Sequence, residues 1–267
     1  MGVGRLGRGL LTGYFGLLVV FLYIPLVVLV IFAFNNNPIQ TLPLSGFTTR
    51  WFHAALSNGD LTGAVERSAW IAALNGLGAT FLGTLAALGL AGRRLRLRPV
   101  FTVLLLLPLV VPYLVLAIGM LILLHELGIN ASLEAVLAGH IVISLPYAVL
   151  VILPRLRTLE QSIVEAARDL GSNELDAFLR VTLPLLAPAL VSSMLIAFTI
   201  SFDEFAIAYF LAPAGSPTYP VFLYSGTRAA ALVPEVIATG AVVIAISMTL
   251  VLLAEVGRRW AERRLAL

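Results

Sequence analysis

The sequence predicts an all-α membrane protein with six transmembrane helices, and three observations support that prediction. Of the 267 residues, 60% are hydrophobic and only 12% are charged, with a mean hydropathy of +1.01. A soluble domain usually has about 45–50% apolar and about 25% charged residues, so this chain has too few charges to cover a water-exposed surface. The apolar residues gather in six long runs, and most of the cations lie between those runs.

The composition excludes several classes of protein. A chain this apolar is disfavoured as a soluble enzyme, a nucleic-acid-binding protein or a disordered protein. It has no cysteine, which excludes disulfides, thiolate metal sites and cysteine nucleophiles. All 17 cationic residues are arginine. A P-loop needs a lysine on the phosphates, so this chain cannot hydrolyse ATP in that way by itself.

Each apolar run is long enough to cross a membrane as a helix. At 1.5 Å per residue, about 18 or more apolar residues cross a hydrocarbon core of about 30 Å. Lipid offers no partners for backbone N–H and C=O groups, so the spans should be helices. The predicted spans are Leu11–Phe34, Ser68–Ala91, Val100–Leu124, Ala135–Leu153, Leu185–Leu211 and Val236–Ala254.

The arginines set the orientation. With the N-terminus in the cytoplasm, 14 of the 17 arginines fall on the inner side, and only Arg50, Arg67 and Arg228 fall outside. The positive-inside rule therefore predicts that both termini are cytoplasmic. The first run superficially resembles a signal peptide, but it is longer than a typical h-region and no A-x-A site follows it. We expect a retained anchor.

The outer connections contain local structure of different kinds. After a stretch rich in Asn, Pro, Gly and Thr, the segment Asn35–Arg67 has Trp51, Phe52, Ala55 and Leu56 at helical spacing, which favours a short helix at the membrane interface. The segment Ala212–Pro234 has four prolines and glycines close together and should be rich in turns.

The second span has a stripe of small residues four positions apart. Ala79, Gly83, Ala87 and Ala91 would lie on one face of the helix and allow another helix to approach closely. Asn75 extends the stripe by one turn. We expect close helix packing along this stripe and an interhelical hydrogen bond from Asn75, in preference to contact with a solute.

The inner loop Pro154–Pro184 predicts two short helices joined at a glycine. Gly171 stands where a left-handed residue would end the first helix. Asn173 can cap the second, which has acidic residues early and Arg180 late, as the helix dipole favours. Pro184 suits the first turn of the next span. Such a hairpin offers a soluble partner a surface to bind.

This loop resembles the EAA loop of permease subunits in bacterial ABC importers, where it forms coupling helices that dock into the cytoplasmic ATPase. The family pattern is E-A-A, three residues, G, nine residues, I, one residue and L-P, and only the isoleucine position differs here. The resemblance implies that the residues that couple to the ATPase are Glu165, Ala166, Ala167, Gly171, Val181, Leu183 and Pro184.

Other segments are similar to spermidine/putrescine-type permeases, specifically to the second of their two permease subunits. One departure is Arg67-Ser68, where relatives tend to have Asn-Ser; this extra cation could alter selectivity for a cationic solute. The segments that carry the similarity are Phe34-Asn35-Asn36, Phe47–Phe52, Gly139-His140-Ile141 and Ser201–Phe205.

The resemblance implies a type I ABC importer permease fold and a multi-pass location in the bacterial inner membrane. It implies four kinds of partner: a cytoplasmic ABC ATPase dimer, a second permease subunit, a periplasmic substrate-binding protein and the lipid bilayer. The permease itself would not be an enzyme and would hold no cofactor or metal, because ATP and Mg²⁺ bind the partner ATPase. The solute would be a polyamine such as spermidine or putrescine, or alternatively another amine, sulfate, ferric iron or thiamine.

Asp203 and Glu204 are adjacent carboxylates in an apolar environment, where ionisable residues are commonly functional. Counted from Leu185, they lie about 27 Å along a helix, near the periplasmic mouth. They could line the substrate path or gate, pair with Arg67 or Arg228, or lie at the water boundary. Three aromatic residues could either contact an amine by cation–π interaction or simply pack: Tyr147, Phe205 and Tyr209.

Two further features have alternative interpretations. We expect His140 to be a buried or hydrogen-bonded helix residue in preference to a proton relay. Pro108, Pro112 and Pro146 could break helices and expose carbonyls to a cavity, or could produce simple kinks. An ion-coupled secondary transporter is the main rival function, but the two halves of the chain show no clear repeat and the EAA loop would be unexplained.

Overall fold

The computed structural model describes residues 5–92, 97–159, 171–228, 233–246 and 248–249. Within these ranges the chain is helical, and strand-like pairing is limited to an isolated bridge between Asn35 and Phe47. Four of the described helices are long and apolar enough to cross a membrane, and a bent helix pair could supply a fifth crossing. The prediction of an all-α protein is thus confirmed for the described part of the chain.

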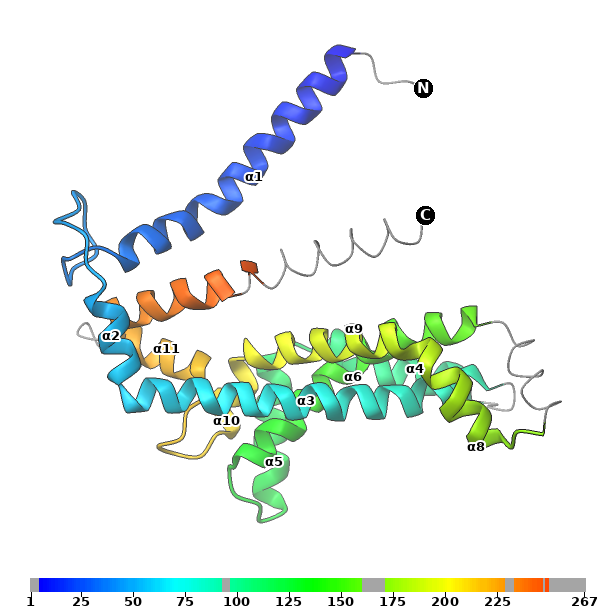
Figure 1. The fold of residues 1–267 in the computed structure, drawn as a ribbon. Coiled ribbons are helices and arrows are strands. Elements are labelled where there is room, and N and C mark those ends of the chain that lie inside the picture. Colours follow the sequence, from blue (N-terminus) through cyan, green and yellow to red (C-terminus); the bar gives the residue numbers. More distant parts are fainter. Residues whose placement is uncertain (1–4, 93–96, 160–170, 229–232, 247, 250–267) are drawn as a thin grey trace. The chain divides into compact units, whose positions relative to one another are not determined.

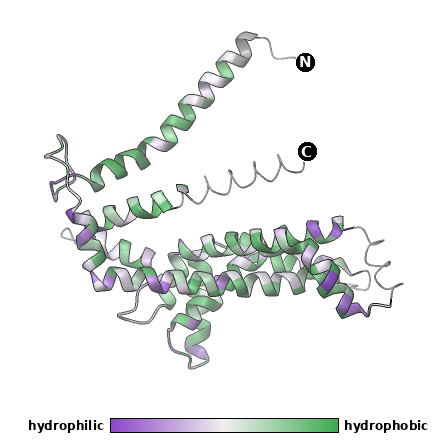
Figure 2. Cartoon of the chain, viewed as in Figure 1, coloured by the Kyte–Doolittle hydropathy of each residue, from purple (hydrophilic) through white to green (hydrophobic). Residues whose placement is uncertain are grey.

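The chain divides into two compact units, and each is described by itself. The first unit comprises Met1–Thr62 with Leu223–Leu267, and the second comprises Gly63–Phe222. Hydrophobic residues run along the long helices of both units, and hydrophilic residues concentrate near helix ends, most clearly around α8 (Figure 2).

The first unit contains α1 (Arg5–Ala33), α2 (Arg50–Ser57) and the helix Val233–Ile246. Asn35 is buried and organises the connection between α1 and α2. Its side-chain Oδ1 accepts hydrogen bonds from the backbone N–H groups of Asn37 and Ser45, and its carbonyl accepts one from the Trp51 indole at 2.8 Å. The short helix predicted around Trp51 is therefore present as α2, held against the end of α1.

Helix α3 (Gly59–Ala91) extends the predicted second span toward its N-terminus. Asn58 explains the earlier start, because its Oδ1 accepts hydrogen bonds from the N–H groups of Asp60 and Leu61 and so caps the helix. The N-terminal turns of α3 are polar, so hydropathy alone could not show that the helix begins before Ser68.

The second unit is built around α3, α6 (Leu133–Thr158) and α9 (Leu183–Phe202), which contact one another along their lengths (Figure 1). Helix α6 includes all of the fourth predicted span, and Ser132 caps it by accepting a hydrogen bond from the N–H of Ala135 at 3.1 Å. A buried apolar cluster joins α6 to α5 and α10 and includes Ala117, Ile143 and Ile207.

The third predicted span, Val100–Leu124, is not one continuous helix. It consists of α4 (Arg98–Leu106), the short 3₁₀ turn η1 (Leu107–Leu109) and α5 (Tyr113–Glu126), and the two helical parts meet at 103°. Pro108 and Pro112 flank the break. Proline lacks a backbone N–H and disfavours helical conformation in the preceding residue, so two prolines this close together end one helix before the other begins.

The fifth predicted span, Leu185–Leu211, is also interrupted. The helical body begins at Glu174, as α8 (Glu174–Ala177) and the π-helical turn η2 (Phe178–Thr182), and continues through α9 to Phe202. Residues Asp203–Phe205, called the elbow below, separate α9 from α10 (Ala206–Leu211). After α10 a turn-rich loop leads to α11 (Tyr219–Arg228). The prediction of turns throughout Ala212–Pro234 is therefore correct for the start of the segment and wrong for Tyr219–Arg228, which is helical. Of the sixth predicted span, Val236–Ala254, the structure describes the part within Val233–Ile246 and residues 248–249.

Candidate functional site

The small-residue stripe on α3 forms a close contact with α6. Ala79, Gly83 and Ala87 are buried. A Cβ atom built on Gly83 would lie 2.5 Å from the Cβ of Ala148, much closer than two carbon atoms can approach. The stripe therefore packs against a helix of the same chain, and the glycine is what permits the approach.

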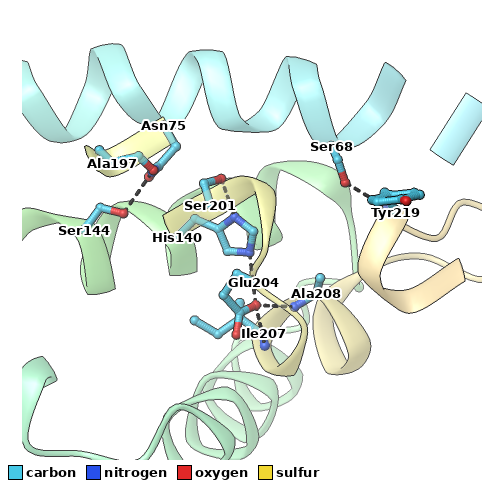
Figure 3. Close-up of polar contacts among 10 residues, drawn as sticks. All are labelled: Ser68, Asn75, His140, Ser144, Ala197, Ser201, Glu204, Ile207, Ala208 and Tyr219. Atoms are coloured by element: carbon cyan, nitrogen blue, oxygen red, sulfur yellow. Dashed lines mark hydrogen bonds and ion pairs between the residues drawn. The ribbon is translucent and has the colours of Figure 1, made fainter. Parts of the chain in front are cut away.

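Asn75 joins three helices of the second unit. It is fully buried on α3, and its Nδ2 donates hydrogen bonds to the Ser144 hydroxyl of α6 at 2.9 Å and to the Ala197 carbonyl of α9 at 2.8 Å (Figure 3). One turn further along α3, Thr80 shares a 3.0 Å hydrogen bond with Ser193 of α9. The predicted interhelical role of Asn75 is thus observed, and it fixes the register of α3 against both neighbours.

The two adjacent carboxylates at the elbow have different environments. Asp203 is the C-cap of α9 and is exposed, whereas Glu204 is buried with 5% of its surface accessible. Glu204 Oε2 accepts hydrogen bonds from the N–H groups of Ile207 at 2.8 Å and Ala208 at 3.2 Å (Figure 3). These groups belong to the first turn of α10 and have no partner within the helix, so the carboxylate caps α10.

His140 on α6 connects the end of α9 to Glu204. The imidazole is buried, its Nδ1 shares a 2.7 Å hydrogen bond with the Ser201 hydroxyl, and its Nε2 lies 3.3 Å from Glu204 Oε2 (Figure 3). The contact with Glu204 is within ion-pair distance but lacks hydrogen-bond geometry, so Ser201 is the hydrogen-bond partner of the imidazole among the described residues. The sequence predicted a buried or hydrogen-bonded histidine, but its two partners lie about sixty residues away in the chain and had no local signal.

The predicted aromatic residues do not form one cluster with the carboxylates. Phe205 and Tyr209 contact each other around the start of α10 with ring centroids 5.3 Å apart, and Tyr209 is half exposed. Tyr147 on α6 instead faces Tyr113, and their hydroxyls are 3.4 Å apart. The two sets lie on different helices, and Asp203 is the member of the predicted group whose charge is exposed.

Arg67 forms a hydrogen bond to the loop that follows α10. Its Nε donates a hydrogen bond to the Pro217 carbonyl at 2.9 Å, and the neighbouring Ser68 hydroxyl accepts one from the Tyr219 N–H at 2.8 Å. Burial raises the pKa of the Tyr219 phenol to about 12, and the negative charge of Asp203 contributes to that rise. Glu204 therefore pairs with His140, while Arg67 is held by the loop; the Arg228 side chain lies outside the described residues.

In the described part of the loop Pro154–Pro184, the predicted glycine turn and helix cap are present, but the second helix continues through η2 into α9 and is not a separate short helix. Gly171 has φ +90°, in the left-handed region, and Asn173 caps α8 by accepting a 2.8 Å hydrogen bond from the Asp176 N–H. Pro184 lies in the first turn of α9 and is exposed. Val181 and Leu183, on the last turns before the span, are half-buried. Three predicted coupling residues lie outside the described residues: Glu165, Ala166 and Ala167.

Among the residues that the structure describes, no group of three or more His, Asp or Glu side chains could hold a metal ion. The arrangement of the described residues offers an electrostatic and a mechanical contribution. It presents one exposed carboxylate at a helix break, a buried polar contact that holds this break to α6, and a helical body that runs from the inner loop to the break.

Comparison with known proteins gives consistent matches over most of the chain. The family described as "Binding-protein-dependent transport system inner membrane component" matches residues 79–267. The spermidine/putrescine transport system permease protein PotC of Escherichia coli K12 is 30% identical over 250 residues, which cover 94% of this chain and 93% of that protein. The putrescine transport system permease protein PotI of the same strain is 36% identical over 215 residues, covering 78% of this chain and 76% of the relative.

The fold is also similar to that of a solved transporter. A crystal structure of a bacterial ABC transporter involved in the import of the acidic polysaccharide alginate matches with a TM-score of 0.70. The match covers 97% of this chain and 99% of that chain at 17% sequence identity. At this identity the likeness concerns the fold.

Proposed function

Because the chain belongs to the family of binding-protein-dependent transport system inner membrane components, we propose that it forms half of the translocation path of an ATP-driven importer of polyamines. The observation that carries this proposal is the similarity, over most of the chain, to permeases named for spermidine and putrescine. Another ABC permease solute, such as another amine, sulfate, ferric iron or thiamine, is the alternative.

In the proposed topology, the single permease domain 1–267 crosses the inner membrane six times with both termini in the cytoplasm. The arginine distribution supports this orientation, because 14 of 17 arginines then lie inside. The bent pair α4–α5 serves as the third crossing, and the helix Val233–Ile246 begins the sixth.

The proposed partners are a cytoplasmic ABC ATPase dimer, a second permease subunit and a periplasmic substrate-binding protein. The segment Gly171–Pro184, called the coupling segment below, continues directly into α9, so a force applied to it by an ATPase would move the whole helix. Glu165, Ala166 and Ala167 complete the proposed contact with the ATPase. ATP and Mg²⁺ bind that partner, and this chain supplies no catalytic residue.

Asp203 is the group best placed to attract a polyamine. Its carboxylate is exposed at the break after α9, whereas Glu204 is buried, accepts hydrogen bonds from two N–H groups and lies 3.3 Å from the His140 Nε2. An exposed anion at the mouth of an apolar path concentrates cations there, because the surrounding low-dielectric walls focus its field. Phe205 and Tyr209, which follow Asp203 in the chain, offer aromatic faces that an ammonium group can contact.

The proposed mechanism is alternating access driven from the cytoplasm. ATP brings the two ATPase subunits together, and each moves the coupling segment that it holds. Rigid helices convert this movement into opening at the periplasmic side and closure at the cytoplasmic side. The substrate-binding protein delivers the polyamine to the opened side, where Asp203 receives it.

Affinity purification from the inner membrane, followed by uptake in proteoliposomes, tests the assignment. We expect the tagged chain to copurify with an ATPase and a second permease, and the complex with its binding protein to import labelled spermidine or putrescine only when ATP is present. An ATP-independent uptake driven by an ion gradient, or a complex without an ATPase, would contradict the proposal.

Two matched substitutions test the site. Asp203→Asn removes the exposed charge and should raise the spermidine concentration needed for half-maximal uptake at matched expression. Glu204→Gln keeps an oxygen acceptor for the two N–H groups and should change that concentration less. Unchanged uptake by Asp203→Asn would remove this carboxylate from the substrate path.

A further inference from the structure

The elbow lies at the far end of a continuous helical body that starts in the inner loop. This body runs from Glu174 to Phe202, 29 residues, and ends where Asp203 caps α9. At 1.5 Å per residue it is about 43 Å long when measured along the helix, and α8 turns away from the axis of α9 (Figure 1). Movement of its inner end reaches the outer mouth only if the residues after Phe202 move together with α9. The contacts that hold the elbow therefore determine how much of this movement reaches Asp203.

The elbow is attached to α6 by polar contacts that are inaccessible to solvent. His140 and Ser201 expose 1% and 3% of their surfaces, and the Glu204 side chain exposes 2%. The imidazole bridges residues on both sides of Asp203: Ser201 in the last turn of α9, and Glu204, which caps α10 (Figure 3). A single side chain of α6 thus contacts both segments that meet at the break.

The close backbone approach beside His140 makes this attachment rigid. A Cβ atom built on the preceding residue, Gly139, would lie 2.6 Å from the Cγ2 of Ile207 in α10. Ile207 and Ala208 are themselves fully buried. The imidazole therefore has little room to move relative to α10, and its contacts with Ser201 and Glu204 are fixed by apolar packing around them.

The choice of polar residues at this position needs an explanation. A buried histidine and glutamate inside an apolar unit are costly, and apolar side chains of similar volume would pack α6 against α10 without that cost. A polar side chain can, however, accept hydrogen bonds from the N–H groups that are left without partners where the helix breaks. It can do so only when its acceptor atom lies in one position relative to those groups. The contacts consequently specify how α9 and α10 are joined, beyond holding them near α6.

We infer that His140 is a positioning residue of the transport cycle: by bridging Ser201 and Glu204 it locks the elbow to α6, so that movement of α9 reaches Asp203 at the mouth. His140 does not touch the solute and acts through Glu204 and the elbow. The inference rests on the proposed function, and it assigns to the buried Glu204 a role different from that of the exposed Asp203.

The test compares uptake with ATP hydrolysis in the complete transporter, reconstituted with its ATPase, second permease and binding protein. His140→Leu removes both polar contacts at similar volume, whereas His140→Gln keeps an amide that can accept from Ser201 and donate to Glu204. Ser193→Ala is the control, because it removes a different hydrogen bond of α9, the one to Thr80 of α3, away from the elbow. Initial rates of labelled spermidine uptake and phosphate release are measured in the same preparation.

We expect His140→Leu to lower uptake about tenfold or more while ATP hydrolysis stays within about threefold of the wild-type rate, since misplacing a group by about 1 Å can cost a factor of about one hundred. His140→Gln should restore the ratio of uptake to hydrolysis to within about threefold of wild type, and Ser193→Ala should leave that ratio unchanged. A structural role alone would lower both activities together, in proportion to the yield of assembled complex.

An unchanged ratio in His140→Leu, or a His140→Gln variant as uncoupled as His140→Leu, would overturn the inference. Should His140→Leu fail to assemble, Ser201→Ala decides instead: it keeps the imidazole near Glu204, and a ratio equal to wild type would again overturn it. Failure of the proposed function is distinguishable, because the wild-type complex would then show no ATP-driven spermidine uptake at all.

Discussion

Replacing Gly83 with alanine tests the close contact between α3 and α6. The new Cβ would lie 2.5 Å from the Ala148 Cβ and 3.4 and 3.5 Å from two of its backbone atoms. Carbon atoms in contact prefer about 3.5–4.0 Å, so the two helices must separate locally by about 1 Å. Overpacking of this kind costs about 1–3 kcal/mol, while alanine in place of glycine returns up to about 1 kcal/mol of helix propensity. We expect a net loss of about 1–2 kcal/mol of unfolding free energy.

The matched control is Gly89→Ala on the same helix. Apart from its chain neighbours and the backbone of its own helix, no atom lies within 4 Å of a Cβ at this position, so the propensity gain remains and the variant should be as stable as wild type or slightly more stable. Unfolding by increasing SDS in mixed micelles, followed by circular dichroism, measures both variants.

The double variant Gly83→Ala with Ala148→Gly isolates the clash. Removing the Ala148 methyl makes room for the new one, so the two changes should show a favourable interaction energy of about 1–2 kcal/mol in a double-mutant cycle. The reasoning would be refuted if Gly83→Ala were no less stable than Gly89→Ala, or if the two changes in the cycle were additive.

Three further changes probe other parts of the chain. Gly171→Val places a β-branched residue at φ +90°, which costs about 1–2 kcal/mol or more in backbone strain, and it should reduce ATP-driven uptake while the subunit still inserts. Gly128→Val is the control: it introduces the same residue at φ +67° after α5 and should not reduce uptake. Equal uptake by the two variants would contradict this prediction. Asn75→Leu removes two interhelical hydrogen bonds and should lower the SDS-unfolding free energy by about 1–2 kcal/mol, and an unaltered unfolding midpoint would show that the junction adds no stability. Asn35→Ala removes the acceptor for two loop N–H groups and should speed proteolysis between α1 and α2 in right-side-out proteoliposomes, and an unchanged cleavage rate would argue against Asn35 as the organiser of that loop.

The sequence predicted which segments become helices better than where those helices break. Hydropathy located the long helices because an apolar stretch of sufficient length has few alternatives in lipid. The prolines at 108 and 112 were recognised as an interruption, but the 103° angle depends on the packing of α5 against α10, which no local pattern encodes. Hydropathy missed the start of α3 at Gly59, because the first turns after the Asn58 cap are polar and hydropathy detects only the apolar part of a helix.

At the candidate site, residue type was predictable and environment was not. The carboxylates Asp203 and Glu204 stand out in an apolar segment, yet on sequence alone either could be the exposed one. Glu204 is the buried one because the helix breaks after Phe202 and because His140, which is distant in sequence, lies beside its carboxylate. The coupling segment was the more predictable part, because the roles of Gly171 and Asn173 depend on local backbone geometry and capping.

The π-helical turn η2 makes the orientation of α8 relative to α9 depend on the number of residues between them. A π turn accommodates one residue more than an α turn, and successive residues of an α-helix are rotated by about 100° about the axis. Deleting one residue from Phe178–Thr182 would convert η2 into ordinary α-helix and would turn α8 by about that angle relative to α9. The face that α8 would present to the proposed ATPase is therefore set by a residue count as well as by residue identity, and a one-residue deletion would change that face while α9 itself stayed intact.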